Sequence, residues 1–181
     1  MEFIAQNLLN ELAEITRSNI SAAQYFKTKS IEELNLRHSN ESWSILECLE
    51  HLNRYGIFYI PEIRKSMQSN IDKRPRQKFR SGLLGNYFAN SMKIKEGSGK
   101  MKAFRSMDPI HSVLSRQVLD LFIEQQNELL DLLEKARNCD LNKIKTGISI
   151  TKLIRIRLGD TFRFVIYHNQ RHIKQARNVL A

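Results

Sequence analysis

The sequence predicts an all-α protein, a four-helix bundle in which long crossover connections join the helices. Four long stretches carry apolar residues three or four positions apart, which is the spacing of one helix face. Only 7 glycines and 3 prolines occur in 181 residues, too few for the many tight turns of a β-sandwich or barrel. Apart from an ambiguous piece over 148–158, no segment shows a convincing strand pattern.

The first long helix is expected over 3–26, and a break follows over 27–30. Residues 31–36 allow one or two further helical turns. The second long helix begins after Ser44, because Ser44 and Glu47 fit a capping box. In that motif the hydroxyl and the carboxylate each accept a hydrogen bond from the other residue's backbone amide.

Pro61 is expected to bend or interrupt this second helix, since it has no N–H to donate to the carbonyl group four residues earlier. The segment 64–107 then changes character, because Lys, Arg and Gly are frequent in it. It predicts a long excursion with one short helix near 83–92. Long connections of this kind inside compact domains are often functional or mobile.

The third long helix is expected over 108–136, because Asp108 suits the N-cap and Pro109 the first helical position. A loop is expected over 138–147, and the last helix over 159–179, starting at a Gly-Asp pair.

Length and composition predict a single domain over 1–181. No run of about eighteen apolar residues is available to span a membrane, and the N-terminus lacks the basic start and apolar block of a signal peptide. Cys48 and Cys139 are too few for a disulfide framework. We therefore expect a cytoplasmic protein with reduced thiols and no membrane partner.

The charge balance is strongly basic, with 29 Lys and Arg against 19 Asp and Glu and a formal net charge of +10. Such a surface attracts anions, which include nucleic acids, anionic lipids and acidic small molecules. Charge alone does not choose among these partners.

Histidine spacing suggests a metal site. His168 and His172 are four residues apart in a predicted helix, so both imidazoles lie on one face, one turn apart. His51, on the edge of the apolar stripe of the second helix, is the best third ligand. The alternative is a surface pair together with an ordinary buried histidine. Cys48 fits a small core residue better than a ligand, and Glu47 already has a capping role.

Two segments resemble the DinB-like (DinB/YfiT) family. Residues 43–52 (WSILECLEHL) resemble the signature near that family's second helix, and 167–175 (YHNQRHIKQ) resemble its final helix with H-x3-H. The resemblance implies a four-helix bundle with a divalent metal held by His51, His168 and His172. It also implies that Gln175 lies close to the site. His38 and His111 match nothing in the family and are expected at the surface or in caps.

Three neutral imidazoles would leave the ion its full charge and open positions for water or substrate, as in catalytic metal sites. Nitrogen ligands suit Zn, Ni, Fe or Cu. Family members include thiol S-transferases and an isomerase that use a low-molecular-weight thiol, and metal-dependent hydrolases. The resemblance therefore implies a thiol S-transferase or hydrolase with a small-molecule substrate, a divalent metal (Zn, Ni or Fe) and a thiol as second cofactor. Family members often form homodimers.

The basic side chains conceivable as anchors for an anionic thiol are Arg64, Arg80, Lys93 and Arg105. No residue is identified as a general base, so the catalytic residue stays open. Two other functions compete. A nucleic-acid binder would use the net charge and the aromatic residues of the basic segment, although no helix-turn-helix, zinc-finger or RRM motif is found. These aromatics are Phe79, Tyr87, Phe88 and Phe104. The other is a non-catalytic, stress-associated bundle.

Overall fold

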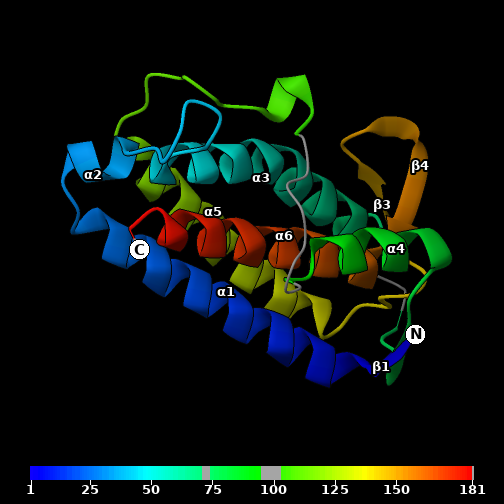
Figure 1. The fold of residues 1–181 in the computed structure, drawn as a ribbon. Helices are drawn as coiled ribbons and strands as arrows, with labels where there is room; N and C mark the ends of the chain where they lie inside the picture. The colour runs from blue at the N-terminus through cyan, green and yellow to red at the C-terminus, as the bar shows by residue number, and fades with distance from the viewer. Residues whose placement is uncertain (71–73, 95–102, 181) are drawn as a thin grey trace.

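The computed structural model describes residues 1–70, 74–94 and 103–180. Four long helices lie alongside one another in Figure 1 and form the body of the protein. They are α1 (Ala5–Lys27), α3 (Ile45–Gln68), α5 (Gln117–Ala136) and α6 (Leu158–Asn178). The predicted all-α bundle is confirmed, and α6 begins within one residue of the expected position.

Helix packing explains why a long crossover is needed. Helix α1 packs against α5 and α6, and α3 packs against the same two helices, so α1 and α3 are diagonal neighbours. The N-terminal halves of α3 and α5 share one apolar cluster, so these two helices run in the same direction. The chain between them must therefore return along the bundle. It does so through β2 (Lys78–Arg80), α4 (Leu83–Met92) and the short helix η1 (Arg105–Met107), and α4 packs against α6.

Local capping signals predicted the start of α3 correctly. The Ser44 hydroxyl accepts the Glu47 N–H at 3.2 Å, and Glu47 Oε2 accepts the Ser44 N–H at 2.8 Å. A second capping box, between Ser30 and Glu33, starts the short helix α2 (Ile31–Asn35). The short helix expected near 83–92 is also confirmed, as α4.

The expected start of the third long helix at Asp108 is wrong, because α5 begins at Gln117. The Asp108 carboxylate is used elsewhere: its Oδ1 accepts the Trp43 indole N–H and the Ile110 N–H, both at 3.1 Å. His111 has a φ of 62°, which a right-handed helix cannot contain. These tertiary contacts hold the segment in a non-helical conformation.

Pro61 does not interrupt α3, which continues to Gln68. Pro61 lies on the exposed side of the helix. A carbonyl group that loses its partner on that side can be hydrated by solvent, so the missing hydrogen bond is tolerated there.

Two small antiparallel sheets were not predicted. Strand β1 (Glu2–Ile4) pairs with β2, so α1 begins at Ala5 rather than residue 3. Strand β3 (Lys145–Ile148), expected as loop, pairs with β4 (Thr151–Arg157), which accounts for the ambiguous piece. In the first sheet Phe3 and Phe79 stack with ring centroids 5.9 Å apart. Phe79 also packs on Gly159, where a Cβ atom would lie 2.7 Å from its ring.

A polar layer divides the core into two apolar clusters. One cluster joins the N-terminal halves of α1 and α6 to the C-terminal halves of α3 and α5, and the other joins the opposite halves. Buried polar side chains from all four helices lie between them. These are Thr16, Asn19, His51, Asn53, Gln125, Gln126, His168 and Asn169. Two of the three candidate ligands therefore lie where the bundle core is polar.

Candidate metal centre

The structure brings together the three histidines that the sequence singled out. His51 comes from α3, and His168 and His172 come from α6. One ring nitrogen from each lies within 4.8 Å of the other two. The Nε2 atoms of His51 and His168 are 3.1 Å apart. His51 and His168 are almost fully buried, whereas His172 is half-buried, so the cluster reaches the surface on one side.

Hydrogen bonds orient two of the rings. His51 Nδ1 lies 2.7 Å from the Met107 carbonyl oxygen, and His172 Nδ1 lies 2.8 Å from Gln175 Oε1. These oxygens accept hydrogen bonds, so each Nδ1 must carry the proton and donate it. A neutral ring then has its lone pair at Nε2. Gln175 thus lies at the site, as the resemblance implied.

The protein keeps all three rings neutral. Burial lowers the pKa of His51 to about 4, against the effect of its hydrogen bond to Met107. Burial and the neighbouring His51 lower the pKa of His172 to about 3. Burial, together with His172 and His51, places the pKa of His168 well below its ordinary value. Neutral imidazole is the form that binds a metal ion.

Aromatic rings surround the cluster. The Trp43 ring lies 4.6 Å from His51 and 5.5 Å from His172, centroid to centroid. The Tyr55 ring lies 4.6 Å from His168, and Phe164 stacks on His168 at 5.8 Å. These rings shield the polar atoms of the cluster from water, which strengthens interactions with any charge bound there.

The donor set fits a first-row divalent cation. A nitrogen ligand lies about 2.0–2.1 Å from such an ion, so two nitrogens on one ion are roughly 3–4 Å apart. The observed separations, from 3.1 Å to at most 4.8 Å, need only small side-chain adjustments to reach this range. Among the described residues, the cluster contains three histidines and no cysteine or carboxylate. It therefore suits an ion that accepts nitrogen ligands.

Two other residues near His51 in the sequence lie outside the group of converging ligand atoms. Cys48 is buried, burial raises the pKa of its thiol, and its sulfur is not part of the cluster. The Glu47 carboxylate accepts hydrogen bonds from Arg37 at 2.6 and 2.8 Å and from the His111 N–H at 2.6 Å. Burial opposes ionisation of Glu47, but these hydrogen bonds lower its pKa overall. Glu47 therefore connects α3 to Arg37 and to the backbone of His111, and it is not a ligand.

The remaining histidines lie outside the cluster, as expected. His38 Nε2 donates to the Asn178 carbonyl oxygen at 3.0 Å, and His111 Nδ1 accepts from Arg37 Nη1 at 3.1 Å.

The four suggested basic anchors are not gathered around the histidines. Arg64 pairs with Glu128, and Arg80 pairs with Glu2. Lys93 Nζ lies 4.9 Å above the Tyr167 ring. Arg105 begins η1, the helix whose last residue contacts His51.

Sequence reasoning missed two contributors to the site. One is the Met107 carbonyl group, which is a backbone atom and leaves no signature in the residue type. The other is Arg54, one turn after His51, which donates to the backbone on both sides of Met107. Its position on the face of α3 that carries His51 was the one signal available.

The metal-free protein is expected to lose stability as the pH falls from about 6.5 towards 4. In that window an unfolded histidine binds a proton, whereas His51, with its pKa lowered to about 4, does not. The unfolded state then binds more protons, so lower pH favours it, by about 2 kcal/mol at pH 5 for one such group. Urea unfolding of chelator-treated wild type and His51→Gln at pH 7.5 and 5.0 measures this. The variant should show the smaller pH effect; equal effects would contradict the assignment.

Comparison with known proteins identifies a family for the chain. Residues 12–176 match the family model of the DinB superfamily. No curated protein and no solved structure shows a significant match to the chain. None of the helices in the described residues is long and apolar enough to cross a membrane.

Proposed function

The chain belongs to the DinB superfamily, and on that premise we propose that it is a metal-dependent enzyme acting on a small molecule. In this proposal His51, His168 and His172 hold a divalent cation. The observation that carries it is the convergence of three neutral imidazoles from two helices within 4.8 Å. Zinc, nickel and iron all accept such a ligand set.

Residues next to the three histidines orient the rings before any ion binds. The Met107 carbonyl and Gln175 hold two rings with their Nε2 lone pairs available, so little reorganisation accompanies binding. A divalent ion bound by neutral ligands activates water or a thiol as a nucleophile near neutral pH. Trp43 and Tyr55 border the cluster and would exclude bulk water from a bound substrate.

Thiol S-transfer and hydrolysis are the two reaction classes that suit this site, with a low-molecular-weight thiol as the second cofactor in the first case. Both need an ion with a vacant position and a nucleophile supplied from solution, since the chain's own buried thiol, Cys48, stays protonated. The net charge of +10 favours anionic substrates or cofactors. Cytoplasmic location and a homodimer remain part of the proposal.

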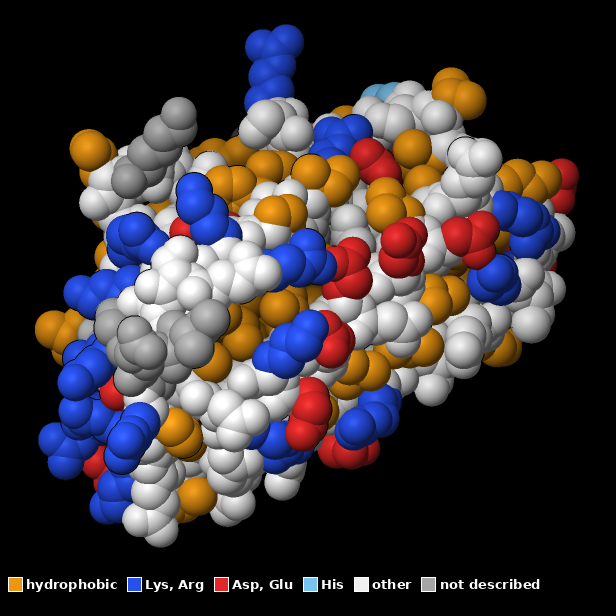
Figure 2. Space-filling view, turned by 180° about the vertical axis from the view of Figure 1, so that it is seen from behind, with side chains coloured by type: hydrophobic (Ala, Val, Ile, Leu, Met, Phe, Trp, Pro, Cys, Tyr) orange, Lys and Arg blue, Asp and Glu red, His pale blue; other side chains and the backbone are white. Residues whose placement is uncertain are grey.

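Nucleic-acid binding has weaker support. Figure 2 shows Lys and Arg side chains gathered at the end of the bundle that carries the two small sheets. Part of this charge is neutralised, since Glu2 pairs with both Lys78 and Arg80. Phe79, expected to stack on bases, is fully buried, although Tyr87 and Phe104 are exposed.

Metal analysis tests the proposal. Protein purified without a histidine tag is expected to carry, or to take up from zinc- or nickel-containing buffer, about one divalent ion per chain. The loaded protein is then screened for thiol transfer to electrophiles and for ester and amide hydrolysis, with and without a chelator. A chain that binds no ion would contradict the proposal. Salt-sensitive binding of RNA or DNA by the metal-free chain would favour the alternative.

A further inference from the structure

The segment 104–111, which we call the clasp, is fastened to the N-terminal part of α3 and to Trp43 just before it. The Trp43 indole N–H donates to Asp108 Oδ1 at 3.1 Å. The His111 N–H donates to Glu47 Oε1 at 2.6 Å. Arg54 Nη1 donates to the Asp108 carbonyl oxygen at 3.0 Å and lies 3.5 Å from that of Ser106. Side chains at or near the start of α3 therefore hold the clasp at several points.

The clasp delivers one backbone group to the metal centre. The Met107 carbonyl oxygen lies 2.7 Å from His51 Nδ1. Because a carbonyl group only accepts hydrogen bonds, it selects the ring form with the proton on Nδ1 and the lone pair on Nε2. The same Nε2 faces His168 at 3.1 Å. A ring with the proton on Nε2 would instead present N–H to the ion and could not bind it.

Arg54 is the residue placed to control this carbonyl group. It donates to the carbonyl oxygens of the two residues that flank Met107. Its Nε donates to Glu50 Oε1 at 2.9 Å on the same helix, which fixes the guanidinium. The planar guanidinium offers several N–H groups in a fixed arrangement, so one side chain can hold its own helix and two carbonyl groups at once.

We propose that Arg54 is a positioning residue, which holds the clasp so that the Met107 carbonyl fixes the ring form and orientation of His51 for metal binding. This inference deepens the proposed function and rests on it. Groups that orient a metal-binding histidine commonly change metal affinity 10- to 100-fold when removed. Arg54 is not one of the three clustered histidines, and its hydrogen bonds reach His51 by way of the backbone around Met107.

The test compares Arg54→Met with Arg64→Met, a control on the same helix whose arginine forms an exposed ion pair with Glu128. Zinc is titrated against a competing chelator in metal-free protein. We expect Arg54→Met to bind zinc roughly 10- to 100-fold more weakly than wild type, and Arg64→Met to bind as wild type does. Arg54→Lys should fall between them, because one ammonium group does not reproduce the planar fork. Equal affinities for wild type and both Arg54 variants overturn the inference.

A second measurement needs no metal. Nitrogen-15 NMR of the imidazoles in metal-free protein reports which nitrogen of His51 carries the proton. Wild type and Arg64→Met should show the Nδ1–H form, and Arg54→Met should show a mixture of both forms. An unchanged ring form in Arg54→Met overturns the inference. If wild type binds no zinc, the proposed function fails, and this spectrum still decides whether Arg54 positions His51.

Discussion

Replacing His168 by glutamine is expected to weaken zinc binding by roughly 10²- to 10³-fold. Complete zinc sites with four ligands are worth about 10–16 kcal/mol, so one ligand contributes roughly 3 kcal/mol. The three ring centroids are nearly equidistant, 4.7–5.0 Å apart, and the Nε2 of His168 lies 3.1 Å from that of His51, so His168 is as close to a shared ion as the other two. Isothermal titration or chelator competition measures the loss. Glutamine retains most of the side-chain volume, so the buried site is not simply emptied.

His38→Gln is the matched control, because it makes the same chemical change at a histidine outside the cluster. It should leave zinc affinity unchanged. Zinc at 100 times its dissociation constant should also stabilise wild type and the control by about 2.7 kcal/mol against urea, and His168→Gln far less. A His168→Gln protein that binds one zinc ion with wild-type affinity would show that the ion is held elsewhere.

Features that depend on neighbours in the chain could be predicted from the sequence. The capping box of Ser44 and Glu47 needs only residues three positions apart, and it marks the start of α3. The spacing of His168 and His172 likewise places both rings on one face of α6. His51 is predicted as the third ligand from its place in a helix and from the resemblance to a family. The structure shows the three rings together.

Features set by distant contacts could not be predicted in the same way. Asp108 followed by Pro109 is a good helix start, but the Asp108 carboxylate binds Trp43 instead. Strand β1 forms because it pairs with β2, where Phe3 stacks on Phe79, a residue far away in the sequence. A strand of three residues is too short to show the alternation of apolar and polar residues that predicts a strand. The role of Met107 in the site belongs to its backbone oxygen, which every residue type possesses.

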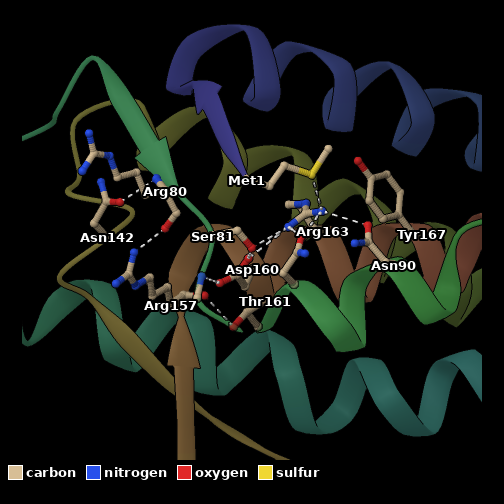
Figure 3. Close-up of polar contacts among 12 residues, drawn as sticks. Met1, Arg80, Ser81, Asn90, Asn142, Arg157, Asp160, Thr161, Arg163 and Tyr167 are labelled. Atoms are coloured by element: carbon tan, nitrogen blue, oxygen red, sulfur yellow. Dashed lines mark hydrogen bonds and ion pairs between the residues drawn. The ribbon is translucent and has the colours of Figure 1, made fainter. Parts of the chain in front are cut away.

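A buried ion pair at the start of α6 likewise could not be predicted from the sequence, because it depends on contacts between distant residues. Arg163 and Asp160 are both fully buried, and Arg163 Nη1 lies 3.1 Å from Asp160 Oδ1. Figure 3 shows the guanidinium among polar groups from the segment that leads into α4 and from α4 itself. It donates to Ser81 Oγ at 2.8 Å and to Asn86 Oδ1 and Asn90 Oδ1 at 3.2–3.3 Å. This cluster therefore attaches the crossover to the bundle.

Contacts with the N-terminal residues and with the segment before α4 complete the burial of Arg163 and Asp160. The Arg163 guanidinium lies 4.7 Å above the Phe3 ring and 3.9 Å from the Met1 sulfur. Asp160 accepts the Gly82 N–H at 2.9 Å and the Ser81 hydroxyl. Arg163 Nε has no hydrogen-bond partner among the described residues, so this arginine is already incompletely satisfied. Removing one member of the pair would leave the other charge buried without its counter-ion.

Arg163→Met is accordingly expected to lower the free energy of unfolding by about 3–5 kcal/mol, the cost of leaving a buried charge unpaired. Asp160→Asn should cost a similar amount for the opposite charge, and the double variant should cost clearly less than the sum, since it leaves neither charge alone. Urea unfolding of the four proteins measures this coupling. Hydrogen exchange should also show α4 losing protection before the four long helices, because the network holds α4 against α6. Additive costs in the double variant, or a loss below about 1 kcal/mol for Arg163→Met, would show that the ion pair does not hold α4 in place.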